Sequence, residues 1–200
     1  MTRIPTQKRS IEKRNKIIEK GFELMCEKGY YNTSTPDIAE SAGVSTGIIY
    51  QYFNDKKDIF IEGVKQYSNS IMFPMINVLK SQKIEINNFD KLLNTMIDKF
   101  IETHTISKKA HEELIAMSHL DSDISSIFKN FEFETTEKIV NLLEANNIHL
   151  ENSREKIHII INIVDNLCHE IVYHKHPQIN YTIMKNEVIK IIENILKEPK

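Results

Sequence analysis

The stretch STPDIAESAGVSTGIIYQYF, from Ser34 to Phe53, contains two short helical segments separated by a glycine. Ser34 can cap the first segment, which has a proline in its first turn and Asp37 three residues later. Gly43 ends that segment, and Ser45 can cap the second one. Two short helices joined by a brief glycine-containing turn have the spacing of a helix-turn-helix.

The second segment carries more aromatic residues than a core can accept from so short a helix. Tyr50 and Tyr52 lie two positions apart, so on a helix their side chains point about 200° apart. The core that fixes the crossing of the two segments is predicted to contain Ile38, Ala39, Ala42, Val44, Ile49 and Phe53. At least one tyrosine is therefore left for a partner outside the core.

The rest of the chain is also helical in pattern. Only five glycines and five prolines occur in 200 residues, and apolar residues recur at three- and four-residue spacing almost throughout. The predicted fold class is all-α, with about nine helices. These are expected near residues 10–28, 36–42, 45–53, 55–80, 89–101, 108–119, 124–146, 153–174 and 181–196. Pro74 is expected to kink or interrupt the fourth helix.

Charge is unevenly distributed along the chain. Residues 1–20 hold seven Lys/Arg against two acidic residues, a net charge of +5, whereas residues 61–200 hold 16 against 20, a net charge of −4. The basic end is the region expected to meet an anionic partner. No apolar run reaches the length of a membrane span, and the N-terminus lacks a signal-peptide stretch. The sequence therefore predicts a cytoplasmic location and no membrane partner.

Residues 29–60, GYYNTSTPDIAESAGVSTGIIYQYFNDKKDIF, resemble the DNA-binding domain of TetR/AcrR-type transcriptional repressors. The resemblance rests on the AGVS sequence at 42–45 together with Gly47, Tyr50, Tyr52, Phe53 and Lys56. It implies a three-helix DNA-binding domain, placed at residues 1–54, followed by a larger helical ligand-binding and dimerisation domain at residues 55–200. Ile48 stands where the family usually has threonine, so base reading at this position would be apolar.

A recognition helix enters the major groove by its N-terminal residues. Gln51 is the best candidate for specificity, because its amide can both donate to and accept from adenine. Following the resemblance, Tyr50, Tyr52 and Lys56 are assigned to phosphates. The full set of predicted DNA contacts is Thr33, Ser34, Thr35, Ser45, Thr46, Gly47, Ile48, Tyr50, Gln51, Tyr52 and Lys56. For the three residues at 33–35, simple helix capping is the alternative role.

A homodimer on a palindromic double-stranded DNA operator is predicted, because two half-sites raise the affinity of a small helix-turn-helix. The last two helices are the expected interface, packed as an intermolecular four-helix bundle. The chosen interface residues are Ile157, Ile161, Val164, Cys168, Val188, Ile192 and Ile195. The alternative is that both apolar stripes pack only inside one subunit.

The resemblance also implies a small-molecule effector that binds among the middle helices. The candidate lining residues are Phe100, His104, His111, Met117, Phe128, Phe131, Asn166, His169 and Tyr173. Methionine and phenylalanine at helical spacing are also ordinary core residues, which is the alternative for this set. The effector is expected to be small and largely apolar.

The sequence contains no motif that is typical of a metal site or an enzyme active site. The single Glu155-x-x-His158 lacks the second pair that a di-iron bundle requires, and His174-x-His176 lies at a helix end. Cys26 and Cys168 are far apart and are expected to be buried thiols. No metal, cofactor or catalytic site is predicted, because GxSxG, HExxH and P-loop motifs are all missing.

The sequence thus predicts a DNA-binding transcriptional regulator, interpreted as a repressor that a small ligand releases from its operator. The alternatives are a ligand-responsive activator and a DNA-binding protein without small-molecule input.

Overall fold

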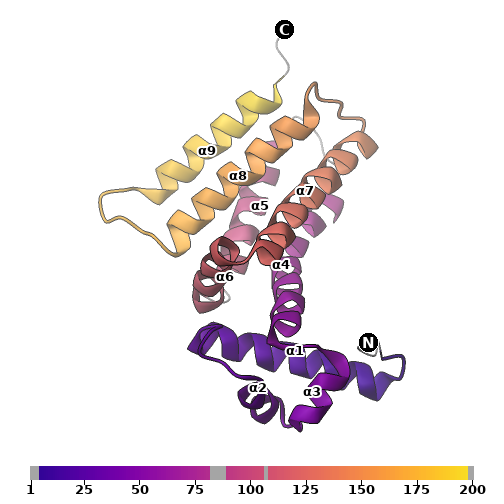
Figure 1. Ribbon diagram of the computed structural model, residues 1–200. Helices are drawn as coiled ribbons and strands as arrows, with labels where there is room; N and C mark the ends of the chain where they lie inside the picture. The colour runs from indigo at the N-terminus through magenta and orange to yellow at the C-terminus, as the bar shows by residue number, and fades with distance from the viewer. Residues whose placement is uncertain (1–4, 82–88, 106–107, 198–200) are drawn as a thin grey trace. The chain divides into compact units, whose positions relative to one another are not determined.

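The protein is described here by a computed structural model that covers residues 5–81, 89–105 and 108–197. Within these ranges the chain forms nine α-helices and no strand, which confirms the all-α prediction. The helices are α1 Lys8–Lys28, α2 Thr35–Ala42, α3 Thr46–Tyr52, α4 Lys56–Ser81, α5 Phe89–His104, α6 Lys108–Leu120, α7 Ser122–Ala145, α8 Ser153–Val172 and α9 Tyr181–Leu196 (Figure 1).

The contacts divide the chain into two compact units. The first contains residues 1–68 and 107–128, and the second contains residues 69–106 and 129–200. The N-terminal parts of α4 and α7 therefore belong to the first unit, and their C-terminal parts belong to the second. The proposed end of the DNA-binding domain at residue 54 concerns function rather than packing, and it stays a prediction.

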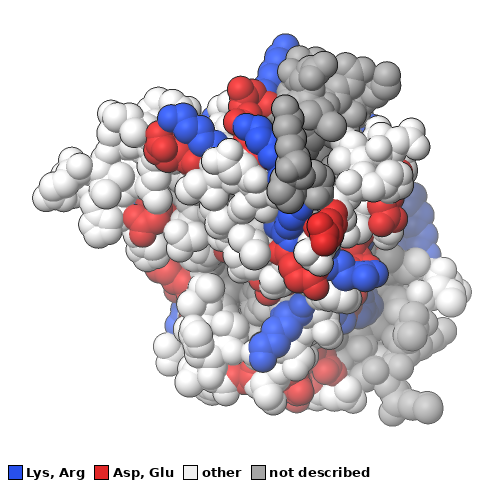
Figure 2. All heavy atoms as spheres, turned by 90° about the horizontal axis from the view of Figure 1, so that it is seen from above, with Lys and Arg blue, Asp and Glu red and all other residues white. Residues whose placement is uncertain are grey.

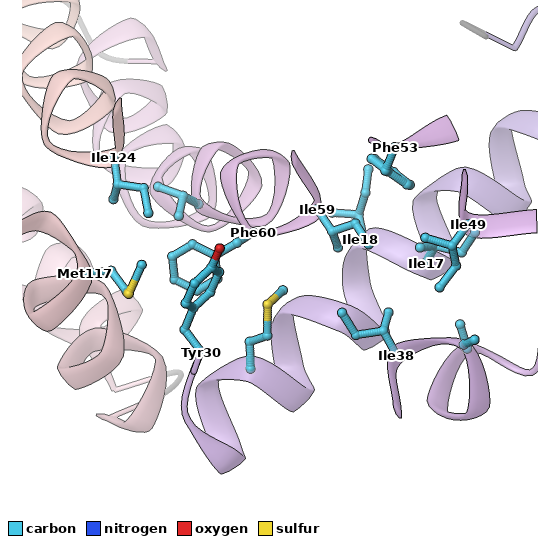
Figure 3. Packing of buried hydrophobic residues seen from close by; sticks show 14 of the residues in the cluster. Ile17, Ile18, Tyr30, Ile38, Ile49, Phe53, Ile59, Phe60, Met117 and Ile124 are labelled. Atoms are coloured by element: carbon cyan, nitrogen blue, oxygen red, sulfur yellow. The ribbon is translucent and has the colours of Figure 1, made fainter. Parts of the chain in front are cut away.

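The core of the first unit fixes α2 and α3 against α1 (Figure 3). Ile17 and Ile18 of α1 meet Ile38 of α2, and all three side chains are fully buried. The α3 segment adds Ile49 and Phe53, which are at most 1% exposed. Burying a large apolar side chain is worth about 1.5–3 kcal/mol relative to leaving it in water. This core therefore holds helices that are too short to be stable alone.

Local signals set the helix boundaries of the first unit as expected. Gly29 ends α1 with φ at +91°, and Gly43 ends α2 in the left-handed region with φ at +68°. Ser34 and Asp37 form the predicted capping box. Pro74 was expected to kink or interrupt α4; it does not interrupt the helix, which continues through it to Ser81. The kink stays a prediction, because proline is a common cause of helix kinks.

Helix α6 and the first turns of α7 complete the first unit. Leu114 and Met117 of α6 and Ile124 of α7 are buried in the same cluster as Phe60 and Tyr30 (Figure 3). Helix α6 also packs against α1. Asp121 caps α7 by accepting hydrogen bonds from the backbone N–H groups of residues 123 and 124.

In the second unit, α5 packs against α8 and α9, which also pack against each other. Phe100 of α5, Leu167 of α8 and Ile192 of α9 are each at most 2% exposed. Both cysteines are buried thiols, as predicted. Burial raises the pKa of Cys26 to about 12, and it also raises the pKa of Cys168, so neither is a ready nucleophile.

Gly63 of α4 packs tightly against Phe22 of α1. A Cβ atom there would lie 2.4–2.6 Å from the Cδ2, Cγ and Cβ atoms of Phe22. We expect Gly63→Ala to lower the free energy of unfolding by about 1–3 kcal/mol, the usual cost of overpacking. Urea unfolding followed by circular dichroism, at one protein concentration, measures this change.

Gly47→Ala is the matched control, because a Cβ at Gly47 would have only the Ser45 hydroxyl oxygen, 4.0 Å away, within contact range. Helix propensity alone should stabilise this variant by up to about 1 kcal/mol. Equal unfolding midpoints for the two variants would show that the α1–α4 contact does not constrain the core.

Candidate nucleic-acid interface

Helix α3 presents two different faces. Ile49 and Phe53 are buried, whereas Tyr50 is 54% exposed and Gln51 is also exposed. Tyr52 is half-buried, and its ring packs edge-on against Phe53 with the ring centroids 6.4 Å apart. Tyr50 and Gln51 therefore reach solvent from a helix whose orientation is fixed by its buried side.

The start of α3 follows directly from the turn that precedes it. The Gly43 N–H donates to the Ala39 and Glu40 carbonyls, and the Val44 N–H donates to the Ala39 carbonyl at 2.9 Å. Ser45 is the N-cap residue, but its side chain makes no capping bond, contrary to the expected role. Its hydroxyl thus lies at the exposed N-terminus of α3, where free N–H groups favour an anion.

The other predicted contacts at this N-terminus differ in exposure. Gly47 is exposed and Thr46 is half-exposed. Ile48, the residue that departs from the family pattern, is partly buried against the core of the first unit. Only part of the Ile48 side chain is therefore available for contact with a base.

Residues 33–35, at the start of α2, differ from one another in burial and hydrogen bonding. Thr33 is 2% exposed, and its hydroxyl donates to the Gly29 carbonyl at 2.9 Å. Ser34 is exposed and belongs to the capping box with Asp37, whose pKa is lowered by that hydrogen bonding. Thr35 is half-exposed. The buried Thr33 hydroxyl therefore stabilises the loop before α2, whereas Ser34 and Thr35 lie at the surface.

The ammonium group of Lys56 forms hydrogen bonds within the protein. Its Nζ donates to the Tyr30 carbonyl at 2.6 Å and to the Thr33 carbonyl at 2.7 Å, and it lies 4.4 Å from the centroid of the Tyr30 ring. Partial burial lowers the pKa of Lys56. Lys56 therefore fastens the start of α4 to the loop before α2, a role that the sequence did not reveal.

Two further polar contacts of the first unit were missed from the sequence, because their partners lie 64 to 83 positions apart. The Glu113 carboxylate of α6 accepts a hydrogen bond from the Tyr30 N–H at 2.5 Å. Lys57 pairs with Asp121 at 2.8 Å and with Asp123 at 2.7 Å. These hydrogen bonds raise the pKa of Lys57 and lower that of Asp121.

The basic residues near the N-terminus differ in exposure and in their contacts. Arg14 pairs with Glu62 at 2.9 Å, and its guanidinium carbon lies 5.1 Å from the centroid of the Phe53 ring. Lys8, Arg9 and Lys16 are exposed and can meet an anion. Elsewhere on the surface, the face shown in Figure 2 mixes basic and acidic side chains in small groups.

The residues predicted to bind an effector are divided between the two units. Met117 is buried in the core of the first unit, and Phe128 packs against that core. His111 of α6 and Phe131 of α7 are half-buried, and Asn166 of α8 is exposed. The remaining four, Phe100, His104, His169 and Tyr173, lie together in the second unit.

A cavity of about 60 Å³ lies in the second unit, and its lining is entirely apolar. Of the predicted effector contacts, only Phe100 lines it. The lining residues are Leu79, Leu92, Leu93, Met96, Ile97, Phe100, Ile139, Leu143, Ile157, Ile160, Ile161, Val164, Ile192 and Leu196. Sequence reasoning favoured polar and aromatic residues and missed this set, whose members look like ordinary core positions.

The predicted interface residues of α8 and α9 mostly face the interior of the second unit. Ile157, Val164, Cys168, Val188 and Ile192 are each at most 8% exposed in the single chain. Four of the seven predicted interface residues line the apolar cavity, namely Ile157, Ile161, Val164 and Ile192. The exposed apolar residues of the two helices are others, namely Ile159, Ile183 and Ile191.

The geometry of α2, the turn and α3 defines a helix-turn-helix DNA-binding regulator. The family "Bacterial regulatory proteins, tetR family" matches residues 17–62, which hold these elements. The chain therefore resembles TetR-family transcriptional regulators, most specifically over residues 17–62. Members of this family are DNA-binding transcription factors.

Three proteins illustrate the similarity. The uncharacterized HTH-type transcriptional regulator YvdT of Bacillus subtilis is 24% identical over 94% of this chain and 97% of its own length. IcaR of Staphylococcus aureus, the negative transcriptional regulator of the biofilm operon icaADBC, is 38% identical over 34% of this chain and 37% of its own. A crystal structure described as a TetR-family regulator from Mesorhizobium loti covers 95% of this chain and 98% of its own with a TM-score of 0.73, at 17% identity.

Replacing Lys56 tests its role as the fastener of the loop. Lys56→Met removes both carbonyl contacts, and we expect the free energy of unfolding to fall by about 1–3 kcal/mol. Urea unfolding at fixed protein concentration measures the loss. Lys65→Met is the control, because Lys65 is exposed and pairs only with Glu62 three residues away, a contact worth about 0.5 kcal/mol or less. Equal losses for the two variants would contradict the structural role of Lys56.

Proposed function

We propose that the protein is a repressor that binds a palindromic operator as a homodimer and leaves it when a small, largely apolar molecule binds the second unit. The observation that carries the proposal is the display of Tyr50 and Gln51 on α3, whose other side is locked into the core. Because the operator is DNA, we place the protein in the cytoplasm.

Base reading is assigned to Gln51, Thr46 and the exposed part of Ile48. Gln51 can donate to and accept from an adenine in the major groove, and Ile48 can contact a thymine methyl group. Tyr50, Tyr52, Ser34, Thr35 and Ser45 are assigned to phosphates, with Gly47 allowing close approach of the backbone. Lys56 contributes chiefly by fixing the loop that carries residues 33–35.

Two observations support repression and its release. IcaR, which resembles about a third of this chain, is a negative regulator. The apolar cavity supports an apolar effector, because a site lined without polar atoms offers no hydrogen bond to a polar molecule. At about 60 Å³ the cavity has room for a small apolar group, so a larger effector must displace lining side chains.

The homodimer is assigned to the side of α8 and α9 that the single chain leaves uncovered. A groove between the two helices is lined by His158, Ile159, Asn162, Ile163, Asn166, Leu167, Met184 and Val188. Ile159 is 49% exposed, and Ile183 and Ile191 of α9 are exposed to a similar extent. A second copy packed on this face would bury these side chains in a four-helix bundle.

Selection of bound DNA from a random pool tests the proposed function. The wild-type protein should enrich a palindrome with half-sites about one helical turn apart. Gln51→Ala should enrich a different half-site or a degenerate one, because about 1–3 kcal/mol of discrimination at one base pair is lost. Failure of the wild-type protein to enrich any palindrome would refute the proposal.

Tyr50→Phe is the matched control for Gln51→Ala. It removes one hydroxyl from the same exposed side of α3 and leaves the ring in place. If Tyr50 contacts a phosphate, affinity for all sequences should fall alike, by about two- to tenfold, with the enriched sequence unchanged. A changed sequence preference in Tyr50→Phe would instead place this residue on a base.

A charge on the proposed dimer face should separate the subunits. Ile159→Glu places a carboxylate where a second copy would exclude water, and we expect dimerisation to weaken at least about tenfold. Sedimentation equilibrium should then shift from twice the chain mass towards 23.4 kDa. Ile115→Glu is the control, because Ile115 is a similarly exposed isoleucine of α6 at 43%. A dimer that survives Ile159→Glu and Ile191→Glu would exclude this face.

A further inference from the structure

The C-terminus of α5 and the middle of α8 bring two histidines and one aspartate together. The Nε2 atom of His104 lies 3.4 Å from Oδ1 of Asp165, and the Nε2 atom of His169 lies 3.6 Å from Oδ2 of Asp165. One ligand atom from each of the three residues lies within 4.8 Å of the other two. In the part of the chain that the structure describes, this is the one such group of three.

The sequence places these residues in a way that favours convergence. Asp165 and His169 are four residues apart on α8, so their side chains leave the same face of the helix. His104 is the last residue of α5, which packs against α8, and it is 2% exposed. Two rigid helices therefore hold the three side chains.

The hydrogen bonds of His104 prepare its Nε2 atom for a cation. Nδ1 lies 2.8 Å from the Phe100 carbonyl oxygen, and since a carbonyl only accepts, Nδ1 carries the proton that is donated. In the neutral ring, Nε2 then directs a lone pair towards the Asp165 carboxylate. The Tyr173 hydroxyl donates to the His104 carbonyl and holds the end of α5. This is the arrangement in which a metal-binding histidine is commonly oriented.

A lone pair that faces a carboxylate is repelled by it, and a cation between the two atoms removes the repulsion. The distance of 3.4 Å from His104 to Oδ1 of Asp165, like that of 3.6 Å from His169 to Oδ2, is longer than the usual hydrogen-bond distance of about 2.7–3.2 Å. Two ligands that each lie 2.0–2.1 Å from a tetrahedral zinc ion are about 3.3 Å apart. Each imidazole is thus separated from its nearer Asp165 oxygen by about the distance between ligands that share one metal ion.

We propose that His104 Nε2, the carboxylate of Asp165 and His169 Nε2 form a binding site for a divalent transition-metal ion. Two imidazoles and one carboxylate suit zinc, and also cobalt and nickel, whereas magnesium and calcium prefer oxygen ligands throughout. Three protein ligands leave at least one position for water or another donor. The bound ion links α5 to α8 inside the second unit, and this proposal does not depend on the proposed operator.

Cobalt is the probe that tests the site, because tetrahedral Co²⁺ gives visible absorption bands that report its ligands. The untagged full chain, freed of metal with EDTA, should bind one Co²⁺ per chain, and Zn²⁺ should displace it. Zinc should also raise the thermal unfolding midpoint, since a ligand that binds only the folded state stabilises it. Magnesium should do neither.

Variants of the two α8 ligands separate a metal site from a simple ion-pair network. Asp165→Asn and His169→Gln should weaken Co²⁺ and Zn²⁺ binding by at least about tenfold and abolish the zinc-dependent rise in the midpoint. Circular dichroism of the metal-free variants verifies that they fold. His176→Gln is the matched control, because His176 Nε2 also faces a carboxylate, Glu170, at 3.9 Å but is not part of a group of three.

Two results would overturn the proposal. One is a wild-type chain that binds neither Co²⁺ nor Zn²⁺ at one ion per chain, which would leave a proton as the cation between His104 and Asp165. The other is binding that His169→Gln and His176→Gln reduce equally, which would assign the ion to scattered surface histidines.

Discussion

The structure depends on one constraint: α3 has only seven residues, and a helix of that length is not stable in water by itself. It persists because Ile49 and Phe53 are buried against α1 and α2. The same burial decides which residues remain outside, since side chains on the opposite side of so short a helix have no core to enter. The display of Tyr50 and Gln51 is therefore a direct consequence of the packing that makes the helix possible.

Predictions from the sequence succeeded where the cause is local. Helix periodicity, the capping box at Ser34 and the left-handed glycine at Gly43 each depend on residues within a few positions of one another. They missed contacts whose partners are distant in the chain. The contact of Lys56 with a phosphate stays a prediction, but its hydrogen bonds to the carbonyls of Tyr30 and Thr33 were not anticipated. No spacing rule relates a side chain to carbonyl oxygens in a loop more than 20 residues earlier.

The helices α8 and α9 show a second limit of sequence reasoning. Ten of the twenty residues of α8 are apolar, so periodicity alone cannot say which of them face the same chain. The structure separates the two sides: Ile157 and Val164 line the internal cavity, whereas Ile159 and Ile163 line the outer groove. A helix that is apolar on both sides is consistent with burial on both sides, one by its own subunit and one by a partner.

In the second unit, Phe100 contacts both the apolar cavity and the polar cluster of His104, Asp165 and His169. Phe100 lines the cavity, and its ring centroid lies 4.3 Å from that of His104. The Phe100 carbonyl accepts a hydrogen bond from the Nδ1–H group of His104. On α8, Val164 lines the cavity and the next residue is Asp165. A movement of the Phe100 ring that enlarges the cavity therefore also changes its edge-on contact with the His104 ring. Because rings in a dense interior have few alternative positions, we expect a molecule in the cavity to affect the His104 ring through this contact.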